Sequence, residues 1–402
     1  MLKISAFKIF IAIALAAPAT GYAAAPAAGS PRADMAAPNA FAFRQYRALA
    51  QQEEGNIFYS PYSVYSAFAM VYEGAKGTTA REIKEAFGFP AELKTLRAGF
   101  SGGRRALETA RGKNEFSVSN SLWAQVNYKF KTAYINTLTE FYGCEAFNLD
   151  FAADPEGERA TINAWVEKKT RSKIKELFAA NSLNSLTRLV LANAVYFKGS
   201  WKNPFPKERT SEGDFFTAPQ TPVKTFFMRS GKPFALPYAA QEDVQALELP
   251  YEGGTLSMLI LLPQGGGLAA LERNLTPEKL KELDAALSEE KVNVSLPKFS
   301  LGLGYDLKAC LRGLGVITAF TELADLSGMD GSRKLFVQKA LHKSFIEVNE
   351  EGTEAAAATG AAMGLKSIEF PAEFSADRPF LFLIREKKSG LILFMGRYAA
   401  PR

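Results

Sequence analysis

Two nearly continuous apolar stretches, residues 118–124 and 189–197, are typical of strands that are buried on both faces. Between them, residues 162–178 carry apolar side chains at helical spacing, so an amphipathic helix is expected there. A strand, a helix and a second strand in succession indicate a fold that mixes both kinds of element.

A helix near the start of the chain is predicted by Phe41, Tyr46 and Leu49, which lie near helical spacing and would pack on the core. Another helix is expected to begin at Ser60, because Pro61 fits the first helical position. Apolar residues continue this second helix to residue 72.

Short apolar runs separated by Pro and Gly fill the second half of the chain and predict strands. These runs are residues 245–249, 257–262, 292–299, 334–337, 344–348, 380–385 and 391–398. A helix is expected at residues 306–314. Neither a linker nor an internal repeat interrupts residues 40–402, so the pattern favours one α+β domain.

The composition is that of a globular protein. Of the 402 residues, 47% are hydrophobic and 22% are charged, which leaves ample material for a core. The formal net charge of +6 is not clustered in a way that indicates nucleic acid, so no specific nucleic-acid partner is expected.

The N-terminus has the pattern of a secretory signal peptide at residues 1–25. Lys3 and Lys8 precede an apolar run over residues 9–17, and small residues follow at Ala23, Ala24 and Ala25, near which cleavage is expected. The apolar run is far shorter than the roughly 20 residues that span a bilayer, so no membrane anchor is expected. We therefore expect a secreted protein, extracellular or periplasmic, with a flexible tail at residues 26–39 and a folded domain at residues 40–402.

The two cysteines, Cys144 and Cys310, are far apart in the sequence. A secreted fold of this size needs no disulfide framework, so we expect both to be free thiols.

Residues 350–367 differ from the rest of the chain because nearly all the side chains in the middle of the segment are tiny. Such a segment cannot hold itself in a core by its own apolar surface. Its one basic residue is Lys366, and no other Lys or Arg lies between Lys343 and Arg378. A segment of small residues that ends in one Lys and lies between two strands could be bound and cleaved by a protease.

Two other interpretations of this segment stay open on its residues alone. Glu354 and the four alanines after it form good helix-forming sequence. Runs of Ala, Gly and Thr are also common in linkers.

One motif in this segment consists of Glu350, Glu351, Gly352, Thr353, Glu354, Ala355, Ala356, Ala357 and Ala358. It resembles the hinge of the reactive-centre loop of inhibitory serpins, a family of serine protease inhibitors. In that family the scissile bond lies a fixed distance beyond the hinge glycine. The resemblance therefore implies Lys366–Ser367 as the reactive bond, on the same Lys that the composition of the segment singles out.

The resemblance covers nearly all of residues 40–402. Stretches that match serpin landmarks in family order are residues 56–64, 163–166 with Lys173 and Ile174, 191–201, 296–299, 340–343, 378–380 and 394–397. Each match is a weak signal alone, but their number and order make chance an implausible explanation.

The resemblance implies a single large α+β domain of three β-sheets surrounded by about nine helices, with an exposed reactive-centre loop at about residues 350–378. It implies an inhibitor and not an enzyme. A trypsin-like serine protease would attack Lys366 and form a covalent acyl complex, and the cleaved loop would insert into the main sheet. No cofactor and no metal are implied, and a monomer is expected.

The single histidine, His342, has two interpretations. As a general base it would need a catalytic partner, but the chain contains no Gly-x-Ser-x-Gly elbow, and one His cannot form an HExxH zinc site. The resemblance instead implies that His342 joins Ser60, Ser63 and Asn193 in a buried polar cluster beneath the main sheet. We call these four residues the shutter cluster. Their hydroxyl, amide and imidazole groups can satisfy one another, which favours a role in conformational gating.

Trp201 can be a core aromatic, and the resemblance also implies that it marks the place where the loop begins to insert. Arg104, Arg105, Arg111 and Lys113 lie where many serpins carry a polyanion-binding helix. Glycines interrupt this face, so a solvated basic surface is favoured over weak polyanion binding.

Three alternative functions remain after the sequence analysis. A non-inhibitory serpin that acts as a carrier or chaperone would share the fold, although the small hinge residues favour an inhibitor. An inhibitor of this kind could also act on cysteine proteases. A hydrolase is opposed by the lack of a catalytic partner for His342.

Overall fold

The apolar stretches at residues 118–124 and 189–197 lie side by side in a five-stranded sheet, as their pattern predicts. The structure is a computed structural model, and it describes residues 35–109, 114–265, 267–352 and 370–401. In spatial order the strands of this sheet are β11 (Phe299–Asp306), β12 (Lys339–Val348), β4 (Leu189–Lys198), β2 (Glu115–Gln125) and β3 (Glu145–Leu149).

A second, ten-stranded sheet contains most of the strands from the second half of the chain. Its order is β1 (Ile57–Tyr59), β15 (Ile392–Tyr398), β14 (Phe380–Glu386), β9 (Leu256–Pro263), β8 (Val244–Pro250), β7 (Phe234–Ala240), β10 (Ser288–Pro297), β6 (Thr221–Arg229) and β5 (Ser211–Ala218), with β13 (Ala372–Ser375) also paired to β10. Three sheets were expected, but the described strands form two. Hydrogen bonds join two of the expected sheets into this ten-stranded one, because β10 pairs with β7 along one half and with β6 and β13 along the other.

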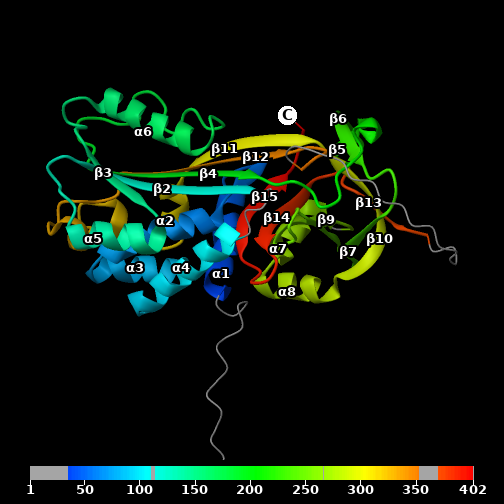
Figure 1. Cartoon of the computed structure of the whole chain (residues 1–402), viewed down its shortest axis with the longest axis horizontal. Coiled ribbons are helices and arrows are strands. Elements are labelled where there is room, and N and C mark those ends of the chain that lie inside the picture. The colour runs from blue at the N-terminus through cyan, green and yellow to red at the C-terminus, as the bar shows by residue number, and fades with distance from the viewer. Residues whose placement is uncertain (1–34, 110–113, 266, 353–369, 402) are drawn as a thin grey trace, which may run out of the picture.

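Ten α-helices lie in the described part of the chain, close to the number expected. They are α1 (Ala36–Ala50), α2 (Pro61–Gly74), α3 (Gly77–Phe87), α4 (Leu93–Thr109), α5 (Thr132–Thr137), α6 (Pro155–Lys169), α7 (Gly267–Asn274), α8 (Pro277–Ala286), α9 (Leu307–Gly313) and α10 (Ser327–Asp330). Short helical turns are η1 (Leu138–Tyr142), η2 (Lys207–Arg209) and η3 (Thr318–Phe320). Figure 1 shows α6 on one face of the five-stranded sheet and α2 to α5 on the side of the opposite face.

Two of the helices that cover the sheet begin where the sequence supplies a cap. The Ser60 side chain accepts a hydrogen bond from the backbone N–H of Ser63, and Pro61 starts α2. Asp154 caps α6 in the same way by accepting from the backbone N–H of Gly157 at 2.9 Å. Local sequence therefore fixes where both helices start.

Strand β4 is buried along both faces, which explains its continuous apolar sequence. Val190, Ala192 and Ala194 pack in one apolar cluster beneath α6. Leu189 and Leu191 belong to the larger core on the other side, which α1 and α2 share. The sheet at β4 is consequently enclosed between two helical layers.

Two predicted elements are wrong in part. The helix expected through residue 178 ends at Lys169, and the chain leaves helical geometry at Arg171 and Ser172, whose φ angles are 51° and 60°. Residues 334–337 form no strand, because Val337 donates its N–H to Ala319 in η3 and not to a neighbouring strand. In both places buried apolar residues lie in irregular segments that pack on the sheet or beside it.

The ends of the folded domain also differ from expectation. Ala36–Asn39 belong to α1 and not to a flexible tail, and the Asn39 amide donates to Gly390 and accepts from Ile392. Part of the segment expected as exposed loop, Ala372–Ser375, is strand β13. The folded domain thus begins before residue 40, and the loop is anchored before residue 378.

Residues 1–34 lie outside the described residues, so the signal peptide stays a prediction. Within the described ranges, none of the helices combines the length and apolar character needed to cross a bilayer. Cys144 and Cys310 are both buried free thiols. Burial raises the pKa of the Cys310 thiol to about 12 and that of Cys144 further still, so both thiols stay protonated at neutral pH.

Candidate functional site

The middle of the five-stranded sheet contains a parallel pair of strands, β4 and β12. They pair from Val190 opposite Lys339 to Tyr196 opposite Phe345. We call this boundary the seam. A parallel pair is slightly less stable per residue than an antiparallel one, and β12 and β4 are each paired antiparallel to their other neighbours, β11 and β2.

Beyond Tyr196 and Phe345 the two strands no longer pair, and a cavity of about 380 Å³ opens at this end of the seam. Its lining residues come from β4, from β12 and from the segment after α6: Arg171, Lys173, Tyr196, Phe197, Lys198, Phe345, Glu347 and Asn349. The seam therefore has a closed part and an open end.

The chain leaves β12 at this open end and enters the predicted hinge. Trp201, just after β4, donates its backbone N–H to the carbonyl of Glu351 at 3.1 Å and its indole N–H to the carbonyl of Asn349 at 2.9 Å. The indole also stacks on Tyr251 with ring centroids 4.5 Å apart. Trp201 is thus a buried core aromatic and a direct contact of the hinge, so its two interpretations are compatible.

Gly352 occupies a position that other residues would strain. Its φ angle is +88°, in the region that favours glycine. A Cβ atom there would lie 2.3 Å from the backbone nitrogen of Trp201 and 2.4 Å from the carbonyl oxygen of Gly199. The hinge glycine is therefore pressed against the backbone that follows β4, at the open end of the seam.

Glu350 fixes the hinge through its side chain and its backbone. Its carboxylate accepts from the Thr210 hydroxyl at 2.8 Å and from the Lys298 ammonium at 3.0 Å, while its carbonyl accepts from the N–H of Phe205 at 2.8 Å. Burial raises the pKa of this carboxyl, but hydrogen bonds from its own backbone N–H, Lys298 and Thr210 outweigh burial and lower the pKa overall. Glu351 forms an ion pair with Lys207 beside it.

The four predicted members of the shutter cluster lie together and are fully buried. The backbone N–H of Ser60 donates to Nε2 of His342 at 3.0 Å, and the Nδ1 atom of His342 contacts the Asn193 carbonyl oxygen. Because Nε2 accepts a hydrogen bond, the proton of the neutral ring is on Nδ1 and is donated to Asn193. Burial lowers the pKa of His342 to about 3, so the ring is neutral at physiological pH.

The cluster extends further than the sequence predicted. The Asn193 amide nitrogen donates to Ser63 and to the side-chain oxygen of Asn120 on β2, and Asn120 donates in turn to the Ser66 hydroxyl at 3.1 Å. The Ser60 hydroxyl donates to the carbonyl of Leu393 at 2.6 Å. The only signal for Asn120 is its register, since it lies directly opposite Asn193.

These contacts place a hydrogen-bonded layer across the seam. His342 is on β12 and Asn193 is on β4, directly opposite each other, while the serines are on α2 or at its cap. Such polar contacts can be broken when strands part and remade when they close, without repacking an apolar core. The Ser60 hydroxyl donates to Leu393 and Nε2 of His342 accepts from a backbone N–H, so these two groups do not form a nucleophile and base pair here, and the role in gating stays a prediction.

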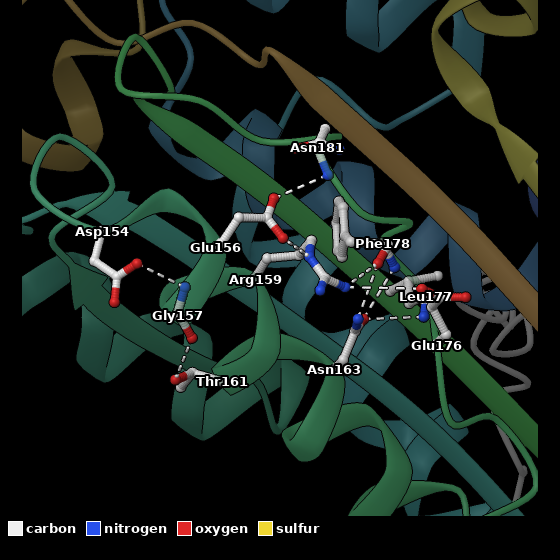
Figure 2. A network of polar contacts seen from close by, with 10 residues as sticks. All are labelled: Asp154, Glu156, Gly157, Arg159, Thr161, Asn163, Glu176, Leu177, Phe178 and Asn181. Atoms are coloured by element: carbon white, nitrogen blue, oxygen red, sulfur yellow. Dashed lines mark hydrogen bonds and ion pairs between the residues drawn. The ribbon is translucent and has the colours of Figure 1, made fainter.

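A second layer covers the other face of the sheet. Figure 2 shows the polar network that holds the segment after α6 against that helix. Asn163 accepts from the backbone N–H groups of Leu177 and Phe178 at 3.0 and 2.9 Å and donates to the carbonyl of Phe178 at 2.9 Å. Arg159 donates to the same carbonyl at 2.9 Å. We call residues 170–181 the covering segment.

The covering segment is also bonded to β12. Lys343 donates to the carbonyl of Glu176 at 2.7 Å, and Lys173 forms a 3.5 Å ion pair with Glu347 and lies 5.2 Å from the centre of the Phe345 ring. Any strand that enters the seam must displace or pass beneath these contacts.

Several predicted site residues cannot be placed. Thr353, Glu354, Ala355, Ala356, Ala357, Ala358, Lys366 and Ser367 lie outside the described residues. Arg104 and Arg105 are in α4, whereas Arg111 and Lys113 are outside the described residues, so polyanion binding stays a prediction.

Comparisons with known proteins agree with this arrangement. The family model described as Serpin (serine protease inhibitor) matches residues 36–401. The chain is 42% identical over 354 residues to the leukocyte elastase inhibitor of Bos taurus, which covers 86% of this chain and 93% of that protein. Among solved structures, Serpin48 of the insect Tenebrio molitor is 32% identical, with a TM-score of 0.80 over 92% of this chain and 98% of that one.

Human thyroxine-binding globulin complexed with thyroxine is 28% identical, with a TM-score of 0.84 over 93% of this chain and 100% of that one. The family match spans almost all the described residues, and each relative is matched over nearly its whole length. The fold expected from the resemblance is confirmed, and the chain belongs to the serpin family of serine protease inhibitors.

Proposed function

We propose that this serpin inhibits trypsin-like serine proteases as a suicide substrate that is cleaved at Lys366–Ser367. The observation that carries the proposal is the position of Gly352 against Gly199 and Trp201 at the open end of the seam. A chain released beyond Gly352 would begin beside the parallel boundary between β4 and β12, where a further strand could enter.

The chemical step belongs to the protease. Its serine oxygen would form an ester with the carbonyl carbon of Lys366 while the Lys366–Ser367 amide bond breaks, and the serine proton would pass to the new Ser367 amine. Residues 352–365 in an extended strand would span roughly 46 Å at about 3.3 Å each, comparable to the size of the domain. Insertion of that strand would carry the attached protease far from its docking position.

The proposed mechanism requires that the uncleaved state be separated from a more stable one by a kinetic barrier. Strand addition and release of strain by loop insertion are established features of serpins. The covering segment and the hydrogen bonds across the seam are the described contacts that would maintain that barrier in this chain.

Lys366 is the reason for assigning a trypsin-like target, because an acidic primary pocket accepts a basic side chain. The name of the bovine relative points to an elastase instead. The target class is therefore tested with both kinds of protease, side by side.

We expect trypsin to lose its activity toward a small chromogenic substrate as the mature protein is added, with an end point near one inhibitor per protease. The Lys366→Ala variant should lose this inhibition at least 100-fold in rate. Arg378→Ala is the matched control, since it removes the next basic residue along the chain, and it should inhibit like the wild type.

Retention of full trypsin inhibition by Lys366→Ala would refute the reactive bond. Faster inhibition of an elastase than of trypsin by the wild type would refute the target class.

A carrier function is the second candidate, favoured by the structural similarity to thyroxine-binding globulin. A carrier would be cleaved by trypsin without inhibiting it, so the same titration separates the two functions.

A further inference from the structure

The most exposed large apolar side chain in the described part of the chain is Phe370, with 89% of its surface accessible. Burying a phenylalanine ring is favourable, so leaving one almost wholly in water needs a reason. Single exposed apolar residues are common on proteins, and exposure alone therefore carries no conclusion. The backbone that supports Phe370 and its distance along the chain from Lys366 are more informative.

The backbone after Phe370 is restricted by a proline and by strand pairing. Pro371 follows it and restricts the residue before it to extended conformations. Strand β13 starts at once, with Ala372 paired to Val292 and Glu373 paired to Asn293. The Asn293 amide also donates to the Glu373 carboxylate at 2.7 Å.

The strand beneath is anchored on both sides. Phe374 is buried with 1% of its surface accessible, and the N–H of Ala376 donates to Ser295 at 2.9 Å. Asp377 accepts from the N–H of Phe216 on β5 at 2.7 Å. A ring held on such a support loses little conformational entropy when a partner covers it.

Phe370 is also close in sequence to the reactive bond under the proposed function. It lies four positions after Lys366, and its Cα atom can be no more than about 11 Å from that of Ser367. When a protease holds Lys366 in its primary pocket, the residues after Lys366 lie on the leaving-group side of its active site. The protease surface on that side is therefore within reach of the Phe370 ring.

We propose that Phe370 is a contact residue for the target protease, and that it docks against an apolar patch beside the leaving-group side of the protease active site. The inference rests on the proposed function for the position of the reactive bond. A few residues, with aromatic side chains prominent among them, often carry most of the binding energy at protein interfaces. Phe370 would act before cleavage, by raising the rate at which the protease is captured.

The test compares second-order rate constants for capture of the trypsin-like protease that the wild type inhibits fastest. Phe370→Ala is expected to reduce this rate constant about tenfold, which corresponds to about 1.4 kcal/mol. Phe370→Trp should restore most of it. Stoichiometry of inhibition and the thermal unfolding midpoint should stay the same, since the ring is almost wholly exposed among the residues that the structure describes.

Leu323→Ala is the matched control. Leu323 is 84% exposed and lies between η3 and α10, which pack against α3 and α2. Figure 1 shows α3 and β13 at opposite ends of the molecule. Loss of this side chain should leave capture unchanged.

Failure of this inference can be told apart from failure of the proposed function. Equal capture rates, within twofold, for wild type and Phe370→Ala would overturn the inference while leaving inhibition intact. If the wild type is cleaved without inhibiting, the same variants are compared as substrates, and kcat/KM for cleavage after Lys366 should then fall about tenfold in Phe370→Ala. An unchanged kcat/KM would overturn the inference in that case as well.

Discussion

At the scale of single residues, the shutter cluster depends on one protonation state of His342. The ring accepts from Ser60 through Nε2 and donates to Asn193 through Nδ1. Protonation would place a second N–H opposite the N–H of Ser60, where no acceptor faces it. Burial adds to this cost, and both effects keep the imidazole neutral.

This protonation state predicts a specific acid sensitivity. An exposed histidine has a pKa near 6.5, whereas the pKa of His342 is about 3. Between these two pH values the unfolded state binds a proton on this ring and the native state does not. Native stability should therefore fall as the pH drops below about 6.5, and the loss is complete only near pH 3. Between pH 7.5 and 5 the expected contribution is roughly 2 kcal/mol of apparent unfolding free energy.

The measurement is denaturant unfolding at both pH values for wild type and His342→Gln. The variant lacks the titrating group but keeps the carboxylates, whose protonation affects both proteins. The wild type should lose about 2 kcal/mol more than the variant. Equal losses in the two proteins would contradict the burial of a neutral His342 at the seam.

Gly352 gives a second prediction at this scale. Gly352→Ala would combine an unfavourable φ angle, at about 1–2 kcal/mol, with a clash against the backbone of Trp201. The hinge should shift, so that more inhibitor molecules are cleaved without capturing a protease. Gly254→Ala is the control, because its φ is +68° but a Cβ there meets no other atom.

The readout for Gly352 is the number of inhibitor molecules consumed per protease molecule. We expect this number to rise severalfold in Gly352→Ala and to stay near the wild-type value in Gly254→Ala. A normal value in Gly352→Ala would mean that the contact with Trp201 has no role in insertion.

Some residues of the shutter cluster could be predicted from the sequence, and others could not, for a physical reason. Ser60, Ser63, Asn193 and His342 were expected to meet, and they do so. Asn120 was not expected, because its role depends on the strand register that places it opposite Asn193. Nothing local in the sequence around Asn120 distinguishes a cluster residue from a surface asparagine.

At the scale of elements, two predictions from periodicity failed in instructive ways. Apolar residues continue at helical spacing beyond Lys169, but Ile174, Leu177 and Phe178 are buried in the covering segment and not on a helix. The strand predicted at residues 344–348 begins earlier, at Lys339. Polar His342 and Ser344 occupy its buried face, so the usual alternation of apolar and polar residues is not visible there.

The covering segment should depend on Asn163 (Figure 2). Asn163→Ala removes the acceptor of two buried N–H groups and the donor to Phe178, with an expected cost of about 2–4 kcal/mol. Thr161→Ala is the control on the same helix, because its exposed hydroxyl bonds only to Gly157 in Figure 2. Denaturant unfolding measures both variants.

We expect the Asn163→Ala variant alone to be destabilised, and to convert faster on warming into a form that no longer inhibits trypsin. Equal stabilities for Asn163→Ala and Thr161→Ala would show that the network does not hold the covering segment in place.

At the scale of the whole molecule, three parts meet at one boundary. The hinge lies at the open end of the seam, the shutter cluster crosses it from beneath, and the covering segment crosses it from above. Resemblance to a family predicted the fold, which the comparisons confirm, whereas the place of insertion stays a prediction. The joining of two sheets through β10 and the lateral contacts of the covering segment come from tertiary pairing, which no local pattern encodes.

The measurement that tests the central claim most directly is denaturing electrophoresis, after boiling, of the protein mixed with trypsin. We expect a band at the summed mass of protease and cleaved inhibitor, because the acyl ester survives once the loop inserts. Thr353→Arg places a charge within the hinge, and this variant should be cleaved after Lys366 without forming the band. Cleavage of the wild type at Lys366 with no such band, or an equally strong band from Thr353→Arg, would contradict trapping by insertion into the seam.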